Sequence, residues 1–488
     1  MKYATPESCG IRTEDIIDYI EQLCDDGLST HSVLIARGDN IIFEKYWAPF
    51  DEDHKHRLYS VTKSFAALAV GFLADEGRIS LDAEISEYFP EECAKITDED
   101  IKAQTVRDML MMRTAFPKNS RNWFTAAPSD RVEEYFTANS GATYPSHTLF
   151  RYDSSGSFVL GALCERVSGM PILEYLNKKL FSKLGITDVD VLKCPGGHSW
   201  MDSGLLMRPR DLMKCARFVL NMGEWRGEQL LSREYLTEAT SSLVPTTAWG
   251  DTNFESYGYG YQIWRTKHDS FFFNGMGCQF AICNPDRDLI LVYNGDNQGI
   301  ATAKNTVING FFNTVYKRAK DEPLPEYQGD PLPEYSLFSL PESTLPEGMA
   351  HISGREFTLL PNALAGGLQS FTLTFREGEG ELDYTTAKGK RTIRFGMGKN
   401  VFDTFPEEGY SDRVGSKPAP EHKYNCASSG AWLSRDVFMI RVQIIDNYFG
   451  NLAITFGFKD KRVTVKMQKC AENFLMGYEG FAKGEMKG

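Results

Sequence analysis

Two residue types that can do chemistry together stand three positions apart in the stretch Tyr59-Ser60-Val61-Thr62-Lys63. Apolar residues then recur at intervals of three and four, which predicts a helix that begins near Ser60. A lysine in the first turn is electrostatically misplaced, because a helix N-terminus favours acidic side chains. Burial and the helix dipole would both favour a neutral Lys63 amine, which could act as a base for the Ser60 hydroxyl. The alternative is an ordinary serine cap followed by a solvated lysine.

A serine-lysine pair needs a second proton-handling group for the leaving group and backbone N–H groups for the oxyanion. The polar segment Arg151-Tyr152-Asp153-Ser154-Ser155-Gly156 stands just ahead of an apolar run that predicts another helix. Loops at a helix start can direct side chains into a cleft. Tyr152 is therefore a candidate acid or base, and Ser154 a candidate substrate-positioning residue. The alternative is that Tyr152 packs as an aromatic side chain and that Ser154 or Ser155 caps the helix.

The elements that must position these residues form an α+β pattern within residues 1–318. An antiparallel sheet with flanking helices and an inserted helical lobe accounts for their order. The predicted elements are a helix at 13–26, strands at 32–37 and 40–46, a helical lobe at about 80–245, strands at 257–264, 271–283 and 288–293, and a helix at 301–316.

A change in composition separates this domain from the rest of the chain. Residues 319–345 are rich in proline and acidic residues, which is typical of a semi-rigid linker. Residues 346–488 contain short alternating runs separated by turn residues, which predicts an all-β, barrel-like domain. No catalytic constellation stands out in this second domain.

The bulk composition limits the classes of partner. With 42% hydrophobic and 24% charged residues, the 488-residue chain is typical of a soluble protein of about two domains. Its formal net charge of −13 argues against nucleic acid and anionic membranes as partners. The ten cysteines form no C-x-x-C pair, so we expect free thiols and no metal site. No signal peptide or membrane span is evident in the sequence, so we expect a cytoplasmic protein.

Several motifs in this order resemble the serine β-lactamase and penicillin-binding-protein-like hydrolases, specifically their class C β-lactamase, esterase and aminohexanoate-oligomer hydrolase branch. The motifs that carry the resemblance are Ser60-Val61-Thr62-Lys63, Thr105–Leu110, Tyr152-Asp153-Ser154, Ser203–Leu212 and Asn284–Arg287. The resemblance spans roughly residues 5–316. It implies a β-lactamase-like fold, a Ser60 nucleophile, and acid and base roles shared by Lys63 and Tyr152, without a cofactor. The second domain loosely resembles the lipocalin-like barrels appended to some of these hydrolases.

The third motif of this family, Lys/His-Thr-Gly, is altered here. We align it with Phe273-Asn274-Gly275, so that Met276 would supply an oxyanion N–H and Asn274 and Gly275 would position substrate. An alignment on Met276-Gly277-Cys278 remains open. Neither alignment provides the cation that helps the family hold the carboxylate of a β-lactam or peptide. The departure therefore favours simple ester or amide hydrolysis.

The sequence thus predicts a serine hydrolase that cleaves a small ester, amide or short peptide through an acyl-enzyme on Ser60. One alternative is a ligand-binding or sensor protein that retains the fold without turnover, and another is a true β-lactamase or D-aminopeptidase. The sequence leaves open the natural substrate, the choice of base between Lys63 and Tyr152, the role of the second domain and whether the chain forms a homo-oligomer.

Overall fold

The computed structural model describes two compact units, one built chiefly from Met1–Gly295 and Ala301–Ser336 and the other from Leu337–Ser411 and Ser416–Gly488. The structure describes residues 1–94, 96–115, 132, 135–136, 141–247, 254–411, 413–415, 418–419, 421–471 and 474–488.

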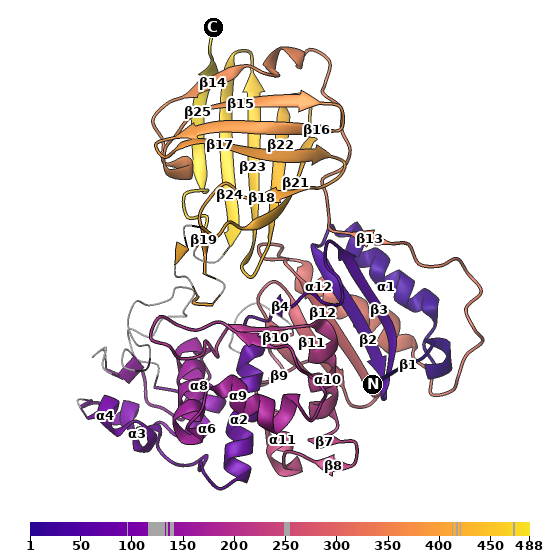
Figure 1. Cartoon of the computed structure of the whole chain (residues 1–488). Coiled ribbons are helices and arrows are strands. Elements are labelled where there is room, and N and C mark those ends of the chain that lie inside the picture. Colours follow the sequence, from indigo (N-terminus) through magenta and orange to yellow (C-terminus); the bar gives the residue numbers. More distant parts are fainter. Residues whose placement is uncertain are drawn as a thin grey trace. The chain divides into compact units, whose positions relative to one another are not determined.

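A mostly antiparallel sheet forms the centre of the first unit, in the order β1-β3-β2-β12-β11-β10-β9 (Figure 1). Its strands are β1 (Lys2–Tyr3), β2 (Thr30–Arg37), β3 (Asn40–Ala48), β9 (Trp264–Arg265), β10 (Phe271–Gly275), β11 (Gln279–Asn284) and β12 (Leu289–Gly295). The short β1 and β13 (Tyr335–Ser336) both pair with β3 in parallel. The predicted antiparallel sheet with flanking helices is confirmed.

Helices cover both faces of this sheet, because its strands are apolar on both sides. On one face Phe273 packs on Phe65 of α2 (Val61–Asp75), with ring centroids 6.4 Å apart. The Cys283 thiol on the same face lies against α10 (Pro209–Leu220). The opposite face meets α1 (Thr13–Asp25) and α12 (Ala303–Phe311), which pack together through Tyr19 and Phe311.

The predicted helical lobe is also present, although part of it lies outside the described residues. Its remaining helices are α3 (Ile85–Tyr88), α4 (Pro90–Cys93), α5 (Glu99–Lys102), α6 (Val106–Leu110), α8 (Ser154–Ser168), α9 (Ile172–Leu176) and α11 (Arg233–Ala239). Two small sheets accompany them: β4 (His56–Arg57), β5 (Asp190–Val191) and β6 (Leu205–Met207) form one, and β7 (Glu224–Trp225) pairs with β8 (Glu228–Gln229) in the other.

Two strand predictions are wrong in detail. The segment 271–283 is a hairpin of two strands, because Gly277 and Cys278 adopt positive φ and reverse the chain. The alternating segment 257–264 is mostly irregular, and only its last residue enters β9. Gly258 and Gln262 have φ of 112° and 55°, which extended strand backbone cannot accommodate.

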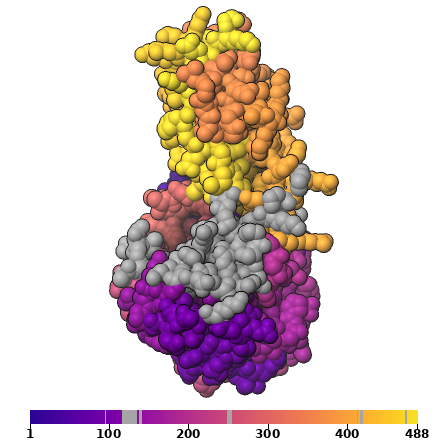
Figure 2. Space-filling model, turned by 90° about the vertical axis from the view of Figure 1, so that its left-hand side faces the viewer, coloured from indigo at the N-terminus to yellow at the C-terminus, as the bar shows by residue number. Residues whose placement is uncertain are grey.

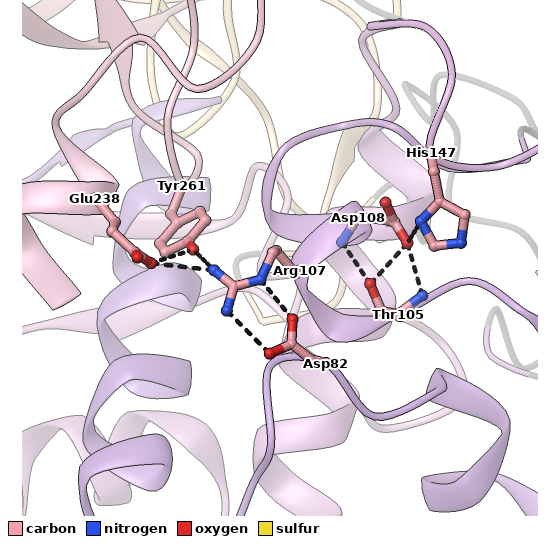
Figure 3. Close-up of polar contacts among 7 residues, drawn as sticks. All are labelled: Asp82, Thr105, Arg107, Asp108, His147, Glu238 and Tyr261. Carbon is pink, nitrogen blue, oxygen red and sulfur yellow. Dashed lines mark hydrogen bonds and ion pairs between the residues drawn. The ribbon is translucent and has the colours of Figure 1, made fainter.

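One polar cluster ties this irregular segment to the helical lobe (Figure 3). Arg107 on α6 bonds to the carboxylates of Asp82 and Glu238 and to the hydroxyl of Tyr261. Arginine donors in a planar fork can hold several acceptors at once. The contact holds Tyr261, and with it the neighbouring Gln262, against the end of α6.

The second unit is a closed β-barrel, which confirms the predicted barrel-like domain; its lipocalin likeness stays a prediction. Its strands are β14 (Glu356–Leu359), β15 (Leu368–Arg376), β16 (Glu379–Thr386), β17 (Gly389–Met397), β21 (Asn425–Trp432), β22 (Val437–Ile445), β23 (Phe449–Lys459), β24 (Arg462–Ala471) and β25 (Gly480–Met486). Parallel pairing of β17 with β21 closes it, and β18 (Val401–Thr404) adds to β21. Between β18 and β21 in the sequence, β19 (Gly409–Tyr410) and β20 (Pro418–Ala419) form a small sheet of their own. Figure 2 shows the outward side chains of the barrel as an orange and yellow surface.

Aromatic side chains fill the barrel interior. The ring of Phe438 is fully buried and lies 5.0 Å from that of Phe375, 5.3 Å from that of Phe395 and 5.1 Å from that of Trp432, between centroids. Aromatic pairs at these separations stabilise a core beyond the area they bury.

We predict that Phe438→Ala lowers the free energy of unfolding by about 3–5 kcal/mol, because it leaves a cavity among these rings. Urea denaturation followed by circular dichroism measures the change. Phe481→Ala is the matched control, since Phe481 is 68% exposed on β25 and its removal should have little effect. Equal effects of the two substitutions would contradict the packed interior.

Candidate active site

Ser60 occupies the N-cap position of α2, but its side chain makes no capping hydrogen bond. Its hydroxyl instead receives a hydrogen bond from Lys63, with Nζ 3.0 Å from Oγ. Lys63 is buried, with 2% of its surface exposed. An ordinary cap followed by a solvated lysine therefore does not describe this turn, because Lys63 is buried and hydrogen-bonds to the partly exposed Ser60 hydroxyl.

The turn ahead of Ser60 is held tightly. Tyr59 has a φ of 48°, a conformation that non-glycine residues adopt only where their surroundings impose it. The guanidinium of Arg57 lies over the Tyr59 ring, 4.5 Å from its centroid. Arg57 itself is in β4, and the next backbone N–H, that of Leu58, donates to Leu205 O at 2.8 Å. These contacts fix the direction in which Ser60 presents its hydroxyl.

The pairing of β4 with β6 also brings Asp202 close to Lys63. Asp202 precedes β6 by a short turn, and its backbone oxygen accepts a hydrogen bond from Lys63 Nζ at 2.5 Å. Burial lowers the pKa of the Lys63 amino group to about 8, opposed by the carboxylates of Asp202 and Asp153. A lysine with this pKa is neutral in roughly a tenth of the molecules at pH 7 and in about half at pH 8. Lys63 can thus serve as a proton acceptor.

Tyr152 lies beside both Ser60 and Lys63. Lys63 Nζ is 5.1 Å from the centroid of the Tyr152 ring, and Trp264 stacks on that ring at 5.9 Å. Burial raises the pKa of the Tyr152 phenol, and a hydrogen bond with Ser60 opposes that rise. A phenol with a raised pKa stays protonated near neutral pH, so Tyr152 is suited to donate a hydrogen bond or a proton.

The loop that carries Tyr152 is fixed by the next residue, Asp153. Asp153 caps α8 by accepting a hydrogen bond from Gly156 N at 3.1 Å, and its other oxygen accepts one from Thr114 Oγ1 at 2.8 Å. Ser154, predicted to position substrate, is the first residue of α8 and is buried. The cap is therefore Asp153 and not Ser154.

Gln262 joins the helices that carry these groups, and sequence analysis did not identify it. Its backbone oxygen accepts a hydrogen bond from Ser64 Oγ of α2, and its side-chain oxygen accepts one from Ser157 Oγ of α8, both at 2.7 Å. Its Nε2 donates to Met109 O and Leu110 O at the end of α6. A buried amide whose hydrogen bonds are all made in this way rigidifies the elements around it.

The strand β10 passes close to the Ser60 turn because Gly275 has no side chain. A Cβ at this position would lie 2.3 Å from Leu58 O and 3.3 Å from Val61 Cγ2. Met276 follows at once, in the turn between β10 and β11. The third-motif alignment on Phe273-Asn274-Gly275 thus runs along the strand beside Ser60. Phe273, which this alignment places at the position of the family's cation, is buried against Phe65.

Asn274 contacts Glu255, and Glu255 in turn contacts Lys304; sequence analysis missed both of these charged residues. Its Nδ2 donates to Glu255 Oε1 at 2.6 Å, and Lys304 of α12 forms an ion pair with the same oxygen. Glu255 precedes β9 in an irregular segment, and Lys304 lies far along the chain. No local motif marks either residue, so their convergence depends on the tertiary fold.

Within the described part of the chain, no three His, Cys, Asp or Glu side chains are arranged to hold a metal ion. No helix there has the length and apolar character needed to cross a membrane.

A family model described as Beta-lactamase matches residues 16–308, which is more than half of the chain. The chain belongs to the Beta-lactamase family. The 6-aminohexanoate-dimer hydrolase of Paenarthrobacter ureafaciens is 27% identical over 307 residues, covering 59% of this chain and 76% of that protein. The resemblance seen in the sequence is thereby confirmed.

Solved structures of the family share the fold. EstCE1, a hydrolase with promiscuous acyltransferase activity, matches with a TM-score of 0.52 and 14% identity, over 61% of this chain and 98% of its own. A penicillin-binding protein homologue from Caulobacter crescentus matches with a TM-score of 0.50 and 16% identity, over 62% and 99% of the two chains. These likenesses support the Beta-lactamase fold of the first unit.

We predict that Gly275→Ala lowers kcat/KM for a p-nitrophenyl ester by about a hundredfold, because a small displacement of β10 from Ser60 misplaces the reacting groups. Gly457→Ala in β23 is the matched control, since a Cβ there meets no atom within 4 Å. Steady-state kinetics measure the effect, and thermal melts establish that both variants fold. A folded Gly275→Ala enzyme with wild-type kcat/KM would show that the close approach is unimportant.

Proposed function

We propose that this chain is a serine hydrolase that cleaves a small ester or amide through an acyl-enzyme on Ser60. The observation that carries the proposal is the hydrogen bond from the buried Lys63 amine to Ser60, together with the hydrogen bond between the Tyr152 phenol and the same serine. An amine that loses its proton near pH 8 beside a serine is the arrangement that nucleophilic catalysis requires.

In the proposed mechanism, Ser60 Oγ attacks the substrate carbonyl while neutral Lys63 accepts the hydroxyl proton. The backbone N–H groups of Ser60 and Met276 hold the oxyanion of the tetrahedral intermediate. The bond to the leaving group then breaks, and the proton taken up by Lys63 reaches the leaving atom through the Tyr152 hydroxyl. A water molecule attacks the acyl-enzyme, gives its proton to Lys63, and releases the acid with return of a proton to Ser60.

Burial favours Lys63 over Tyr152 as the base. Removing water from around a group penalises its charged form, which for lysine means a lower pKa and for tyrosine a higher one. Both shifts are present here. The same burial thus supports a proton acceptor at Lys63 and a proton donor at Tyr152.

The substrate class follows from the third motif. Phe273 is an apolar packing residue where β-lactam-recognising relatives carry a cation, so a substrate carboxylate would find no charge at that position. The relative that hydrolyses 6-aminohexanoate dimer acts on an amide, and EstCE1 is a hydrolase with acyltransferase activity. Both support a small amide or ester as the substrate, in preference to a β-lactam.

We predict that Ser60→Ala abolishes p-nitrophenyl ester hydrolysis and labelling by a fluorophosphonate probe, because the nucleophilic oxygen is removed. Mass spectrometry of the digested wild-type protein should locate the adduct on the peptide that contains Ser60. Ser64→Ala, one turn along α2, is the control and should still react, since its hydroxyl bonds to Gln262 O. Wild-type rates in Ser60→Ala would refute the mechanism, and a wild-type protein inert to every electrophile would favour a binding protein.

A further inference from the structure

A row of buried polar side chains crosses one end of the central sheet and belongs to none of the family motifs. Its members are Ser32 on β2, Asn294 on β12 and Gln279 on β11, and all three are fully buried. Ser32 lies opposite Asn294 in the pairing of β2 with β12. Buried polar groups cost free energy unless they are hydrogen-bonded, so the partners of this row show what it holds.

The hydrogen bonds run along the row in one direction. The Ser32 hydroxyl donates to Asn294 Oδ1 at 3.0 Å, and Asn294 Nδ2 donates to Gln279 Oε1 at 2.9 Å. Gln279 Nε2 in turn donates to the backbone oxygens of Met276, at 3.3 Å, and Gly295. A side-chain amide carries its acceptor and its donors on different atoms. Because Asn294 occupies Oε1, the Gln279 amide is fixed with its N–H groups toward these two backbone oxygens.

Gln279 lies on the face of the sheet that meets the Ser60 turn. It stands opposite Gly275 in the hairpin of β10 and β11. A Cβ added to Gly275 would lie 2.3 Å from Leu58 O and 3.0 Å from Gln279 Cβ. The Gln279 side chain therefore starts on the side of the hairpin where the backbone just ahead of Ser60 makes its closest approach.

The turn that Gln279 holds has an unusual backbone. Gly277 and Cys278 have φ of 77° and 71°, and a non-glycine residue keeps such a conformation only where its surroundings impose it. The hydrogen bond from Gln279 to Met276 O is one such constraint. The Met276 N–H, assigned to the oxyanion in the proposed mechanism, stands at the beginning of this turn. Its direction therefore depends on how firmly the turn is held.

We propose that Gln279 is a positioning residue for the oxyanion hole, which holds the Met276 turn so that the Met276 N–H meets the oxyanion formed at Ser60. Asn294 and Ser32 act through Gln279 by fixing its amide. This inference rests on the proposed function and adds the residues that prepare its oxyanion site. Oxyanion donors stabilise the transition state because they are in place before the charge develops, so a side chain that fixes such a donor raises kcat without touching substrate.

The test compares a p-nitrophenyl ester with the matching thionoester, in which sulfur replaces the carbonyl oxygen. Sulfur accepts hydrogen bonds weakly, so correctly placed oxyanion donors favour the ester. We expect Gln279→Met to lower kcat/KM for the ester about tenfold, a part of the loss that follows complete removal of an oxyanion donor, and to lower that for the thionoester much less. The effect should lie in kcat, with KM little changed.

Gln443→Met is the matched control for this substitution. Gln443 is a buried glutamine of the barrel whose Nε2 also donates to a backbone oxygen, Phe338 O, at 2.8 Å. Its replacement removes the same groups from a site outside the hydrolase unit, so the ratio of ester to thionoester kcat/KM should stay at the wild-type value.

Ser32→Ala is a second, milder variant, because it removes only the first donor of the row. The ratio of ester to thionoester kcat/KM should fall about threefold, less than in Gln279→Met. Thermal melts establish that the variants fold. If Gln279→Met does not fold, Ser32→Ala decides, and an unchanged ratio in the folded Ser32→Ala protein overturns the inference.

The outcomes separate this inference from the proposed function. If folded Gln279→Met lowers both kcat/KM values by the same factor, or lowers neither, Gln279 has only a structural role and the inference is wrong, while hydrolysis at Ser60 stands. A wild-type enzyme that cleaves the two compounds equally well also overturns the inference, because it has no oxyanion donors for Gln279 to position. If the wild-type protein cleaves neither compound, the proposed function fails and the inference fails with it.

Discussion

The structure of the first unit depends on keeping the Lys63 amine out of water next to the Ser60 hydroxyl. A lysine in the first turn of a helix is unfavourable when charged, and burial makes the charged form costlier still. Both effects favour the neutral amine, which can accept the proton of a nearby serine hydroxyl. The backbone oxygen of Asp202 and the carboxylates of Asp202 and Asp153 oppose them, so the pKa falls to about 8 and no further.

The scaffold around this pair keeps the Lys63 amine out of water and beside the partly exposed Ser60 hydroxyl. Pairing of β4 with β6 places Asp202 beside Lys63, and the close approach of β10 at Gly275 covers the other side. Gln262 hydrogen-bonds to α2, α8 and α6, and so fixes relative to one another the helices that position the serine, the lysine and the tyrosine. Its φ of 55° is the same feature that prevents 257–264 from forming a strand.

Short sequence patterns predicted those residues of the site that lie close together on a single helix or loop. The Ser60–Lys63 spacing, the helix that follows it and the loop carrying Tyr152 are short-range features, and the structure brings these residues together. The alternation of aromatic residues and glycine at 257–264 led to a wrong strand prediction. A hydrophobic periodicity gives no information about which residues adopt positive φ. Glu255 contacts Asn274 and Lys304 contacts Glu255, all from distant segments, so no spacing in the chain could have indicated that cluster.

The most direct test of a neutral Lys63 is to titrate its amine in the folded protein. Lysine labelled at the ε-carbon can be followed by heteronuclear NMR as a function of pH, and the Lys63→Met variant identifies the signal. The lowered pKa predicts that Lys63 loses its proton as the pH rises through about 8. A midpoint at the ordinary lysine value of 10.5 would contradict the account, because the amine would then be charged at every pH where the enzyme is expected to work.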